Sequence, residues 1–164
     1  FFMRGAMWER QKKIDLAEAQ FRKVLAIDPE HAGALNYLGY MLVDRGSRVE
    51  EATQMIKKAV EIDPENGAYL DSLGWAYYQQ GKLQEAEGLL VRAIEKIGAD
   101  PTVKDHLADV YLKLGKIKEA VTQWQASLKD FHSAAGADSD PEDVAKVTRK
   151  LDAARVKLAK ETGK

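Results

Sequence analysis

Apolar residues recur at helical spacing in two kinds of run that alternate along the chain. In the first kind, Leu35, Leu38 and Leu42 follow i, i+3 and i+7, a spacing that lines one face of a helix. A glycine follows this run, and a second amphipathic run begins a few residues later, as at Ala52 and Ile56. The pattern therefore predicts a chain built of amphipathic helix pairs.

These runs repeat with a period of 34 or 35 residues. Three sets of small residues keep the period: Ala17, Ala52, Ala86 and Ala120; Gly5, Gly39, Gly74 and Ala108; and Gly46, Gly81 and Gly115. The one extra residue lies in the turn after Gly46, where a loop accepts it at little cost. Self-similarity at such a period is typical of stacked repeats, which share a core with their neighbours.

Glycine and proline positions predict where the helices end and where they approach closely. A glycine such as Gly46 suits a left-handed residue at the end of a first helix. Gly39, in mid-helix, costs about 1 kcal/mol relative to Ala, so we expect a neighbouring helix to need the space. Two Asp-Pro pairs, at 28–29 and 63–64, are predicted to follow second helices. Those at 100–101 and 140–141 are predicted to be an N-cap followed by proline at the first helical position.

The repeat resembles the tetratricopeptide repeat. The resemblance rests on the pattern Leu-x-x-Leu-Gly-x-x-Tyr, a glycine, an Ala-rich second run and a closing Asp-Pro, and it covers residues 1–131. Four residues depart from the pattern: Gly98 for the closing Pro, Lys104 at an apolar position, Ser127 for Ala, and Arg4 for Leu. The stretches 36–40, 70–78 and 105–111 are similar to a bacterial group of multi-repeat proteins, often exported or envelope-associated.

The resemblance implies an all-α fold: a right-handed α-solenoid of antiparallel helix pairs, the tetratricopeptide superhelix, with a C-terminal capping helix. We expect the array to occupy 1–131, as units 1–31 (partial), 32–66, 67–100 and 101–131. A flexible loop over 132–140 and a capping helix over 141–164 are expected to follow. The chain begins with Phe1 rather than Met, so we expect a piece cut through the first helix of a longer array.

The expected C-terminal helix has two interpretations. It carries apolar residues such as Val147 and Leu151 on one face and Lys or Arg elsewhere. A stacked array needs a terminal unit with a polar outer side, so the helix can be a solvating cap. Alternatively, it occupies a groove, its own or a neighbour's, until a partner releases it.

Composition and the absence of catalytic motifs narrow the function. The 164 residues carry 25 Lys and Arg against 26 Asp and Glu, a net charge of -1, which argues against a nucleic-acid or anionic-membrane surface. There is no Cys for disulfides or thiolate zinc sites. No apolar run approaches the roughly 18 residues of a membrane span, so we expect a soluble piece with no membrane insertion, by resemblance from a bacterial periplasm or cell envelope. No phosphate-binding loop or nucleophile motif is present, so we expect a non-enzymatic protein with no cofactor.

The resemblance implies a partner-binding groove on the concave wall formed by the first helices. Carried over residue by residue, its lining is Asn36, Tyr37, Tyr40, Asp44, Asp71, Ser72, Trp75, Tyr78, Gln79, Asp105, His106 and Asp109. We expect each to be at least partly exposed, because these positions lie between the buried stripe residues. Tyr and Trp are enriched at binding hot spots, and carboxylates beside them favour a protein or peptide partner with basic or aromatic residues. The other interpretation is that the aromatic rings are core and the Asp residues a solvated face.

Three other functions are disfavoured. A clamp for the acidic tails of heat-shock chaperones uses Lys, Arg and Asn, whereas the corresponding positions here hold Asp71 and Asp105. Asp105, His106 and Asp109 come from one helix turn and make a weak metal site, so no metal is expected. Base reading by a related repeat class would need a basic path for phosphates, which this wall lacks.

Self-association is the alternative to a ligand-binding groove. Phe1, Phe2, Met3, Met7 and Trp8 form an apolar run at the start of the chain. Such a surface is a candidate interface, with copies of the chain or with upstream repeats. In that case the array is a structural module for self-association and does not bind a ligand in its groove.

Overall fold

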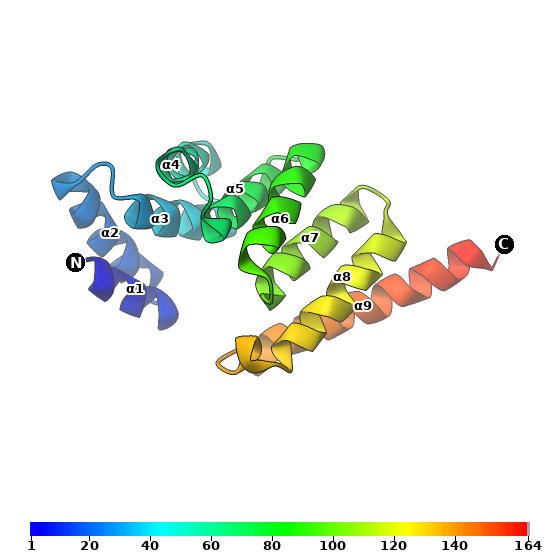
Figure 1. The fold of residues 1–164 in the computed structure, drawn as a ribbon. Helices are drawn as coiled ribbons and strands as arrows, with labels where there is room; N and C mark the ends of the chain where they lie inside the picture. The colour runs from blue at the N-terminus through cyan, green and yellow to red at the C-terminus, as the bar shows by residue number, and fades with distance from the viewer. Residues whose placement is uncertain (164) are drawn as a thin grey trace. The chain divides into compact units, whose positions relative to one another are not determined.

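A computed structural model describes residues 1–163, and these form an all-α fold (Figure 1). Nine α-helices and one short 3-10 helix follow one another in this part of the chain: α1 (Phe2–Arg10), α2 (Ile14–Ile27), α3 (Ala32–Asp44), α4 (Val49–Ile62), α5 (Gly67–Gln79), α6 (Leu83–Ile97), α7 (Pro101–Lys113), α8 (Ile117–Phe131), η1 (Ala134–Gly136) and α9 (Pro141–Thr162). The predicted all-α class, with sequential helix pairs and a long C-terminal helix, is confirmed. Lys164, the last residue of the expected capping helix, lies outside the described residues.

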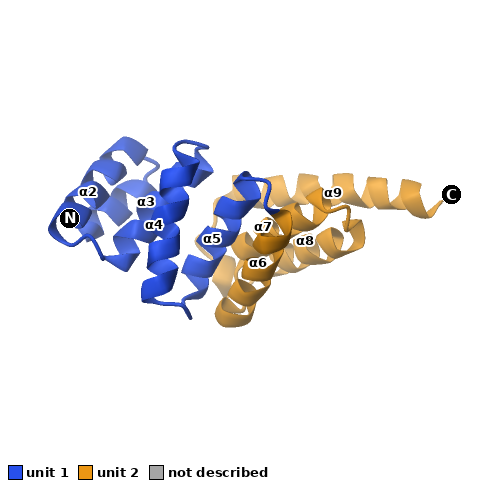
Figure 2. Ribbon diagram, turned by 90° about the horizontal axis from the view of Figure 1, so that it is seen from above, with its two compact units in different colours: residues 1–82 blue, residues 83–164 orange. Residues whose placement is uncertain are grey.

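The chain divides into two compact units, Phe1–Lys82 and Leu83–Lys164 (Figure 2). Unit 1 holds α1 to α5, and unit 2 holds α6 to α9. The boundary falls inside 67–100, which the period assigns to a single repeat. Within unit 1, α1 packs on α2 and α3 packs on α4; within unit 2, α7 packs on α8 and α8 packs on α9.

Small residues set the distance between the paired helices of unit 1. A Cβ atom at Gly39 would lie 2.6 Å from Ile56 Cγ1 and 2.9 Å from the backbone oxygen of Ala52. At Gly5 it would lie 2.8 Å from the ring of Phe21. The expectation that Gly39 makes room for the neighbouring helix is therefore confirmed. Ala52, Ile56 and Phe21 are fully buried at these contacts.

The helix ends follow the predicted residues. Gly46, Gly81 and Gly115 have φ between +66° and +78°, and Lys12, one period before Gly46, takes the same left-handed conformation with φ of 58°. The Asp100 carboxylate accepts hydrogen bonds from the backbone N–H groups of Thr102 and Val103. Asp140 accepts one from the N–H of Glu142 in the same way. Both expected N-caps are confirmed, and α2 and α4 end directly before their Asp-Pro pairs.

Two of the departures from the repeat pattern make compensating contacts in unit 2. The hydroxyl of Ser127, which is fully buried, donates to the backbone oxygen of Pro101 at 2.7 Å, so the small polar residue ties α8 to α7. Lys104 forms a close ion pair with Asp130 across the same helix pair. A polar group at a core position is acceptable when it has a partner, and both groups have one.

The C-terminal helix covers the outer apolar face of α8. Its buried residues join a single cluster with α7 and α8, made of Ala108, Ala120, Val121, Trp124, Val147, Leu151 and Ala154. The expected loop over 132–140 contains η1, whose N-cap is Ser133: the hydroxyl accepts a hydrogen bond from the N–H of Ala135. In the described part of the chain, no helix combines the length and apolar character needed to cross a bilayer.

We predict that Gly39→Ala lowers the free energy of unfolding by about 1–3 kcal/mol, because the added methyl group overpacks the contact with Ile56 and Ala52. Gly88→Ala is the matched control: Gly88 lies inside α6 with nothing within 4 Å of an added Cβ. That change should raise stability by up to about 1 kcal/mol through helix propensity. Urea denaturation followed by circular dichroism measures both, and equal midpoints for the two variants would contradict the close approach.

Candidate functional site

Two stacked aromatic rings stand out on α5. The rings of Trp75 and Tyr78 lie 4.8 Å apart between centroids and 12° from parallel, and both side chains are half-buried. They are three residues apart, which places them on one helix face. Half-buried, stacked rings present a rigid, amphipathic contact surface with few side-chain rotamers left to fix.

The residues expected on α3 are also accessible. Asn36, Tyr37 and Tyr40 are half-buried, and Asp44 is exposed at the end of the helix. In unit 1, therefore, five of the expected groove residues on α3 and α5 are half-buried aromatic or amide side chains, and Asp44 and Gln79 are exposed. These are the groups that a partner can reach without unfolding the unit.

The expectation of at least partial exposure is wrong for Asp71, Ser72 and His106. All three are buried. In unit 1, α5 is packed against both α3 and α4, so the faces on either side of its apolar stripe are covered as well. Ser72 is satisfied inside its helix, where its hydroxyl donates to the backbone oxygen of Ala68 at 3.0 Å. In unit 2, α7 is likewise packed between α6 and α8.

On α7 the two remaining acidic candidates contact the C-terminal helix. Lys150 Nζ of α9 lies 2.9 Å from Asp105 Oδ1 and 3.0 Å from Asp109 Oδ2. The indole N–H of Trp124 also donates to Asp105 Oδ1, at 2.9 Å. The expected acidic wall is therefore not open here: a lysine of the same chain already holds both carboxylates.

The pKa values reflect this arrangement. Desolvation raises the pKa of Asp109, and the neighbouring Asp105 carboxylate raises it further, against the lowering effect of Lys150. Desolvation lowers the pKa of Lys150, but the two carboxylates outweigh it and the net pKa is raised. Lys150 therefore stays charged through neutral pH. These contacts, with the buried residues of α9, support the cap interpretation of the C-terminal helix.

Four aromatic rings form a cluster between α1, α2 and α3. Phe2 lies 5.8 Å from Phe21, 4.8 Å from His31 and 5.7 Å from Tyr37, and Tyr37 stacks on Phe21 at 5.2 Å. His31 also caps α3, since its Nδ1 accepts from the N–H of Ala34. Phe2, which is half-buried, thus packs in the aromatic cluster of unit 1 rather than standing free.

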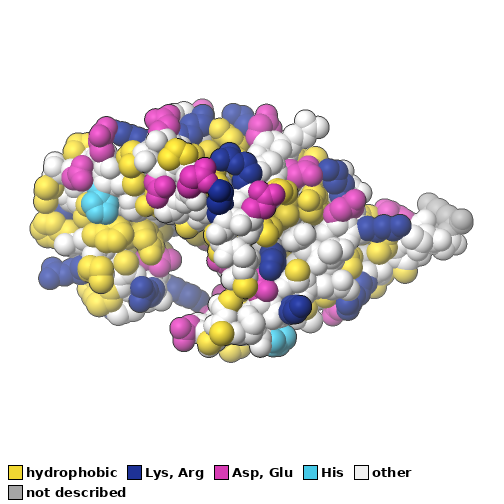
Figure 3. All heavy atoms as spheres, in the orientation of Figure 1, with side chains coloured by type: hydrophobic (Ala, Val, Ile, Leu, Met, Phe, Trp, Pro, Cys, Tyr) yellow, Lys and Arg dark blue, Asp and Glu magenta, His cyan; other side chains and the backbone are white. Residues whose placement is uncertain are grey.

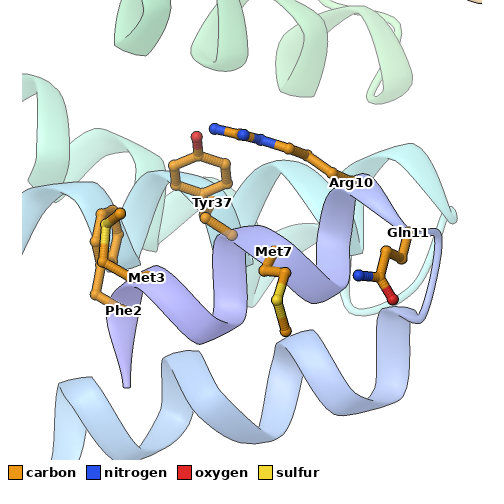
Figure 4. Close-up of a pocket in the computed structure, with 7 residues that line it drawn as sticks. Phe2, Met3, Met7, Arg10, Gln11 and Tyr37 are labelled. Atoms are coloured by element: carbon orange, nitrogen blue, oxygen red, sulfur yellow. The ribbon is translucent and has the colours of Figure 1, made fainter.

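An open hollow of about 490 Å³ lies beside this cluster (Figure 4). Its lining consists of Phe2, Met3, Ala6, Met7, Arg10, Gln11 and Tyr37. In the close-up, the Arg10 side chain extends along the rim toward the Tyr37 hydroxyl (Figure 4). The hollow brings one expected groove residue, Tyr37, together with three residues expected to self-associate.

Three other residues of the N-terminal apolar run are more exposed than Phe2. Phe1 is 59%, Met3 80% and Met7 41% exposed, and Trp8 is half-buried beneath the ammonium group of Lys13. In the space-filling view, hydrophobic side chains gather over the N-terminal helices of unit 1 (Figure 3). The sequence did not single out Arg10, Gln11 or Lys150, because each is a polar residue that carries no periodic signal.

The described residues hold no group of three or more His, Asp or Glu side chains arranged to bind a metal ion. The only such combination raised by the sequence, on α7, is occupied by Lys150 through its two carboxylates.

Comparison with known proteins points to one family. Two family models described as tetratricopeptide repeat match residues 9–67 and 67–97. A TPR repeat-containing protein of Pseudomonas aeruginosa is 38% identical over 108 residues. The match covers 66% of this chain but only 18% of that relative.

Solved structures share the fold at low identity. A thermophilic TPR protein of Thermus thermophilus has a TM-score of 0.70 at 20% identity, covering 93% of this chain and 78% of that one. PcrH, in complex with the chaperone binding region of PopD, has a TM-score of 0.66 at 18% identity, covering 76% of this chain and 90% of that one. In the Cut9–Hcn1 structure the TM-score is 0.81 at 20% identity, covering 94% of this chain and 29% of that one.

We predict that Lys150→Met lowers the free energy of unfolding by about 1–2 kcal/mol at pH 7, because it leaves Asp105 and Asp109 without their cation. The loss should shrink near pH 4. A carboxyl group whose folded pKa is raised costs stability as pH rises through that pKa, and Asp109 is increasingly protonated below it.

Urea denaturation at pH 7 and pH 4 tests this, with Lys146→Met as the control, since Lys146 is an exposed lysine on the same helix. The control should change stability little at either pH. An equal loss for Lys150→Met at both pH values would contradict the electrostatic explanation.

Proposed function

Since this chain is a tetratricopeptide repeat protein, we propose that it is a non-enzymatic scaffold or adaptor that binds a peptide or protein partner through side chains of its first helices. The binding wall that we propose within unit 1 consists of Asn36, Tyr37, Tyr40, Asp44, Trp75, Tyr78 and Gln79. Asp71 and Ser72, which we expected in this wall, are buried. The relative in Pseudomonas aeruginosa favours a bacterial setting, and the cell envelope remains our expectation from the resemblance.

The stacked pair on α5 is the observation that carries this proposal. Trp75 and Tyr78 are large rings held at 4.8 Å, half-buried and on one helix face. Hot spots of protein interfaces are enriched in such residues, because they bury much area at low cost in side-chain entropy. The exposed carboxylate of Asp44 is the one acidic group of the proposed wall that a basic partner residue would reach.

The structural neighbours supply the second support. PcrH shares the fold of this chain and was solved with the chaperone binding region of PopD, a segment of another protein. At 18% identity this likeness concerns the fold alone, so we take from it only that a helical array of this kind can hold a protein segment. Asp105, His106 and Asp109 belong to our expected site by resemblance, but His106 is buried, and in this chain we propose that Asp105 and Asp109 serve mainly to anchor α9.

We predict that Trp75→Ala weakens binding of a protein partner by about tenfold or more, the effect expected of a hot-spot residue. Proteins captured by the immobilised chain are identified, the strongest is purified, and its Kd is measured by calorimetry. Tyr77→Ala is the matched control: Tyr77 lies on the same helix but contacts Lys57 and Lys82. It should change the Kd by less than about twofold. Equal affinities for Trp75→Ala and the unmodified chain would refute the α5 surface as the site.

Self-association is the alternative, and the exposed apolar residues of α1 favour it. Met3 and Phe1 expose most of their surface, at 80% and 59%. Exposed apolar surface next to the chain start is suited to a second copy or to further repeats. Phe2 contributes differently, because its ring packs in the aromatic cluster.

For this alternative we predict a size by light scattering that rises with concentration and falls back to the monomer in Met3→Glu. Val156→Glu is the control, as Val156 is 57% exposed on α9, at the other end of the chain. A monomer at every concentration up to the millimolar range would rule out self-association. Met3 is the better position for this test than Phe2, whose substitution would damage the core of unit 1.

A further inference from the structure

The hollow beside α1 combines an apolar floor with a cationic rim. The apolar part of its lining includes Met3, Met7 and the rings of Phe2 and Tyr37 (Figure 4). Methionine side chains are flexible and adapt to differently shaped apolar groups. The hollow is therefore suited to receive one apolar side chain, and its volume of about 490 Å³ is large enough for it.

Arg10 supplies the charge at the rim. It is exposed, and it forms no hydrogen bond or ion pair with any side chain in residues 1–163. The acidic group next to it in the chain, Glu9, is half-buried, and desolvation raises its pKa, against the lowering effect of Arg10.

We propose that this hollow binds a peptide with an apolar side chain followed, two residues later, by Asp or Glu. The proposal rests on the proposed interaction function and names a partner chemistry for one end of its wall. The apolar group lies between Met3 and Met7, and the carboxylate pairs with Arg10. An arginine can hold a carboxylate through two parallel hydrogen bonds, which gives this position its specificity.

The spacing follows from helix and strand geometry. Five residues separate the midpoint of Met3 and Met7 from Arg10, which is about 7.5 Å along a helix with a rise of about 1.5 Å per residue. In an extended peptide, side chains at i and i+2 point to the same face and are about 6.6 Å apart. The i, i+2 spacing is therefore close to this separation along the helix backbone, and the long Arg10 side chain, which extends toward Tyr37, can adjust to the remaining difference (Figure 4).

A second copy of the chain fits this surface less well than a peptide does. A two-fold contact places the same patch on both sides, so the apolar walls would meet, but none of the residues that line the hollow carries a carboxylate for the Arg10 of the other copy. An acidic peptide is complementary to both features, and charge complementarity mainly sets the choice of partner.

The test uses the intact chain with carbon-13 labels on its methionine methyl groups. The sequence has four methionines, and only Met3 and Met7 line the hollow, so the signals of Met41 and Met55 are internal controls. The probes are two acetylated pentapeptide amides, Ser-Leu-Ser-Glu-Ser and Ser-Leu-Ser-Lys-Ser. We expect the glutamate peptide to shift the Met3 and Met7 signals and to bind about two- to fivefold more tightly than the lysine peptide.

Arg10→Gln should abolish the preference for glutamate and leave the methyl shifts in place. Arg4→Gln is the matched control, because Arg4 is an exposed arginine of the same helix that does not line the hollow. It should keep the preference. A preference that survives Arg10→Gln, or equal binding of the two peptides, overturns the proposed partner chemistry.

Three further outcomes overturn the proposed location. These are shifts confined to Met41 and Met55, no shift at millimolar peptide, and shifts of Met3 and Met7 that follow protein concentration alone, which would assign the hollow to a second copy. Failure here is distinct from failure of the interaction function. If a purified protein partner shifts the indole signal of Trp75 but not the Met3 and Met7 methyls, the chain is an interaction scaffold and the hollow is not its peptide site.

Discussion

The close approach of two helices at small residues is the contact on which the rest of this structure depends. Ile56 and the Ala52 backbone lie so close to Gly39 that no Cβ would fit there. The helices α3 and α4 can therefore pack only with the faces that carry these small residues in contact. Once that face is fixed, the rotation of α3 about its axis is fixed as well. The side chains between the buried stripe residues, Tyr37 and Tyr40 among them, are then held at the surface of unit 1.

The need to cover the last apolar face explains the C-terminal helix. Trp124 and Val121 on α8 would be exposed without α9, and three of its residues, Val147, Leu151 and Ala154, bury them. The same helix brings Lys150 against the carboxylates of α7. The helix that covers the core thus also neutralises the carboxylates of Asp105 and Asp109, which the sequence alone would assign to a ligand-binding surface.

The fold could be predicted from the sequence because its signals are local and periodic. The positions of small residues, the glycines at helix ends and the Asp-Pro pairs each act within one or two helix turns, and the structure places helix boundaries where they indicate. The candidate site could be predicted only in part. Trp75 and Tyr78 are accessible as expected, but the burial of Asp71 and His106 depends on helices that are neighbours in space. The departures at Ser127 and Lys104 likewise find their partners on another helix.

The sequence by itself determined the class of the fold and the helix pairs, because a 34- or 35-residue period of small and apolar positions is compatible with few other structures, and its signature residues indicated the family by resemblance. The tertiary structure alone decided which of the polar residues are available. Lys150 is 41 residues from Asp109 in the chain, and Phe2 is 35 residues from Tyr37, yet each pair is in contact. The period of the sequence indicates which face of each helix is buried. Ion pairs and hollows depend instead on which side chains of two different helices meet, and that is decided by how the helices pack.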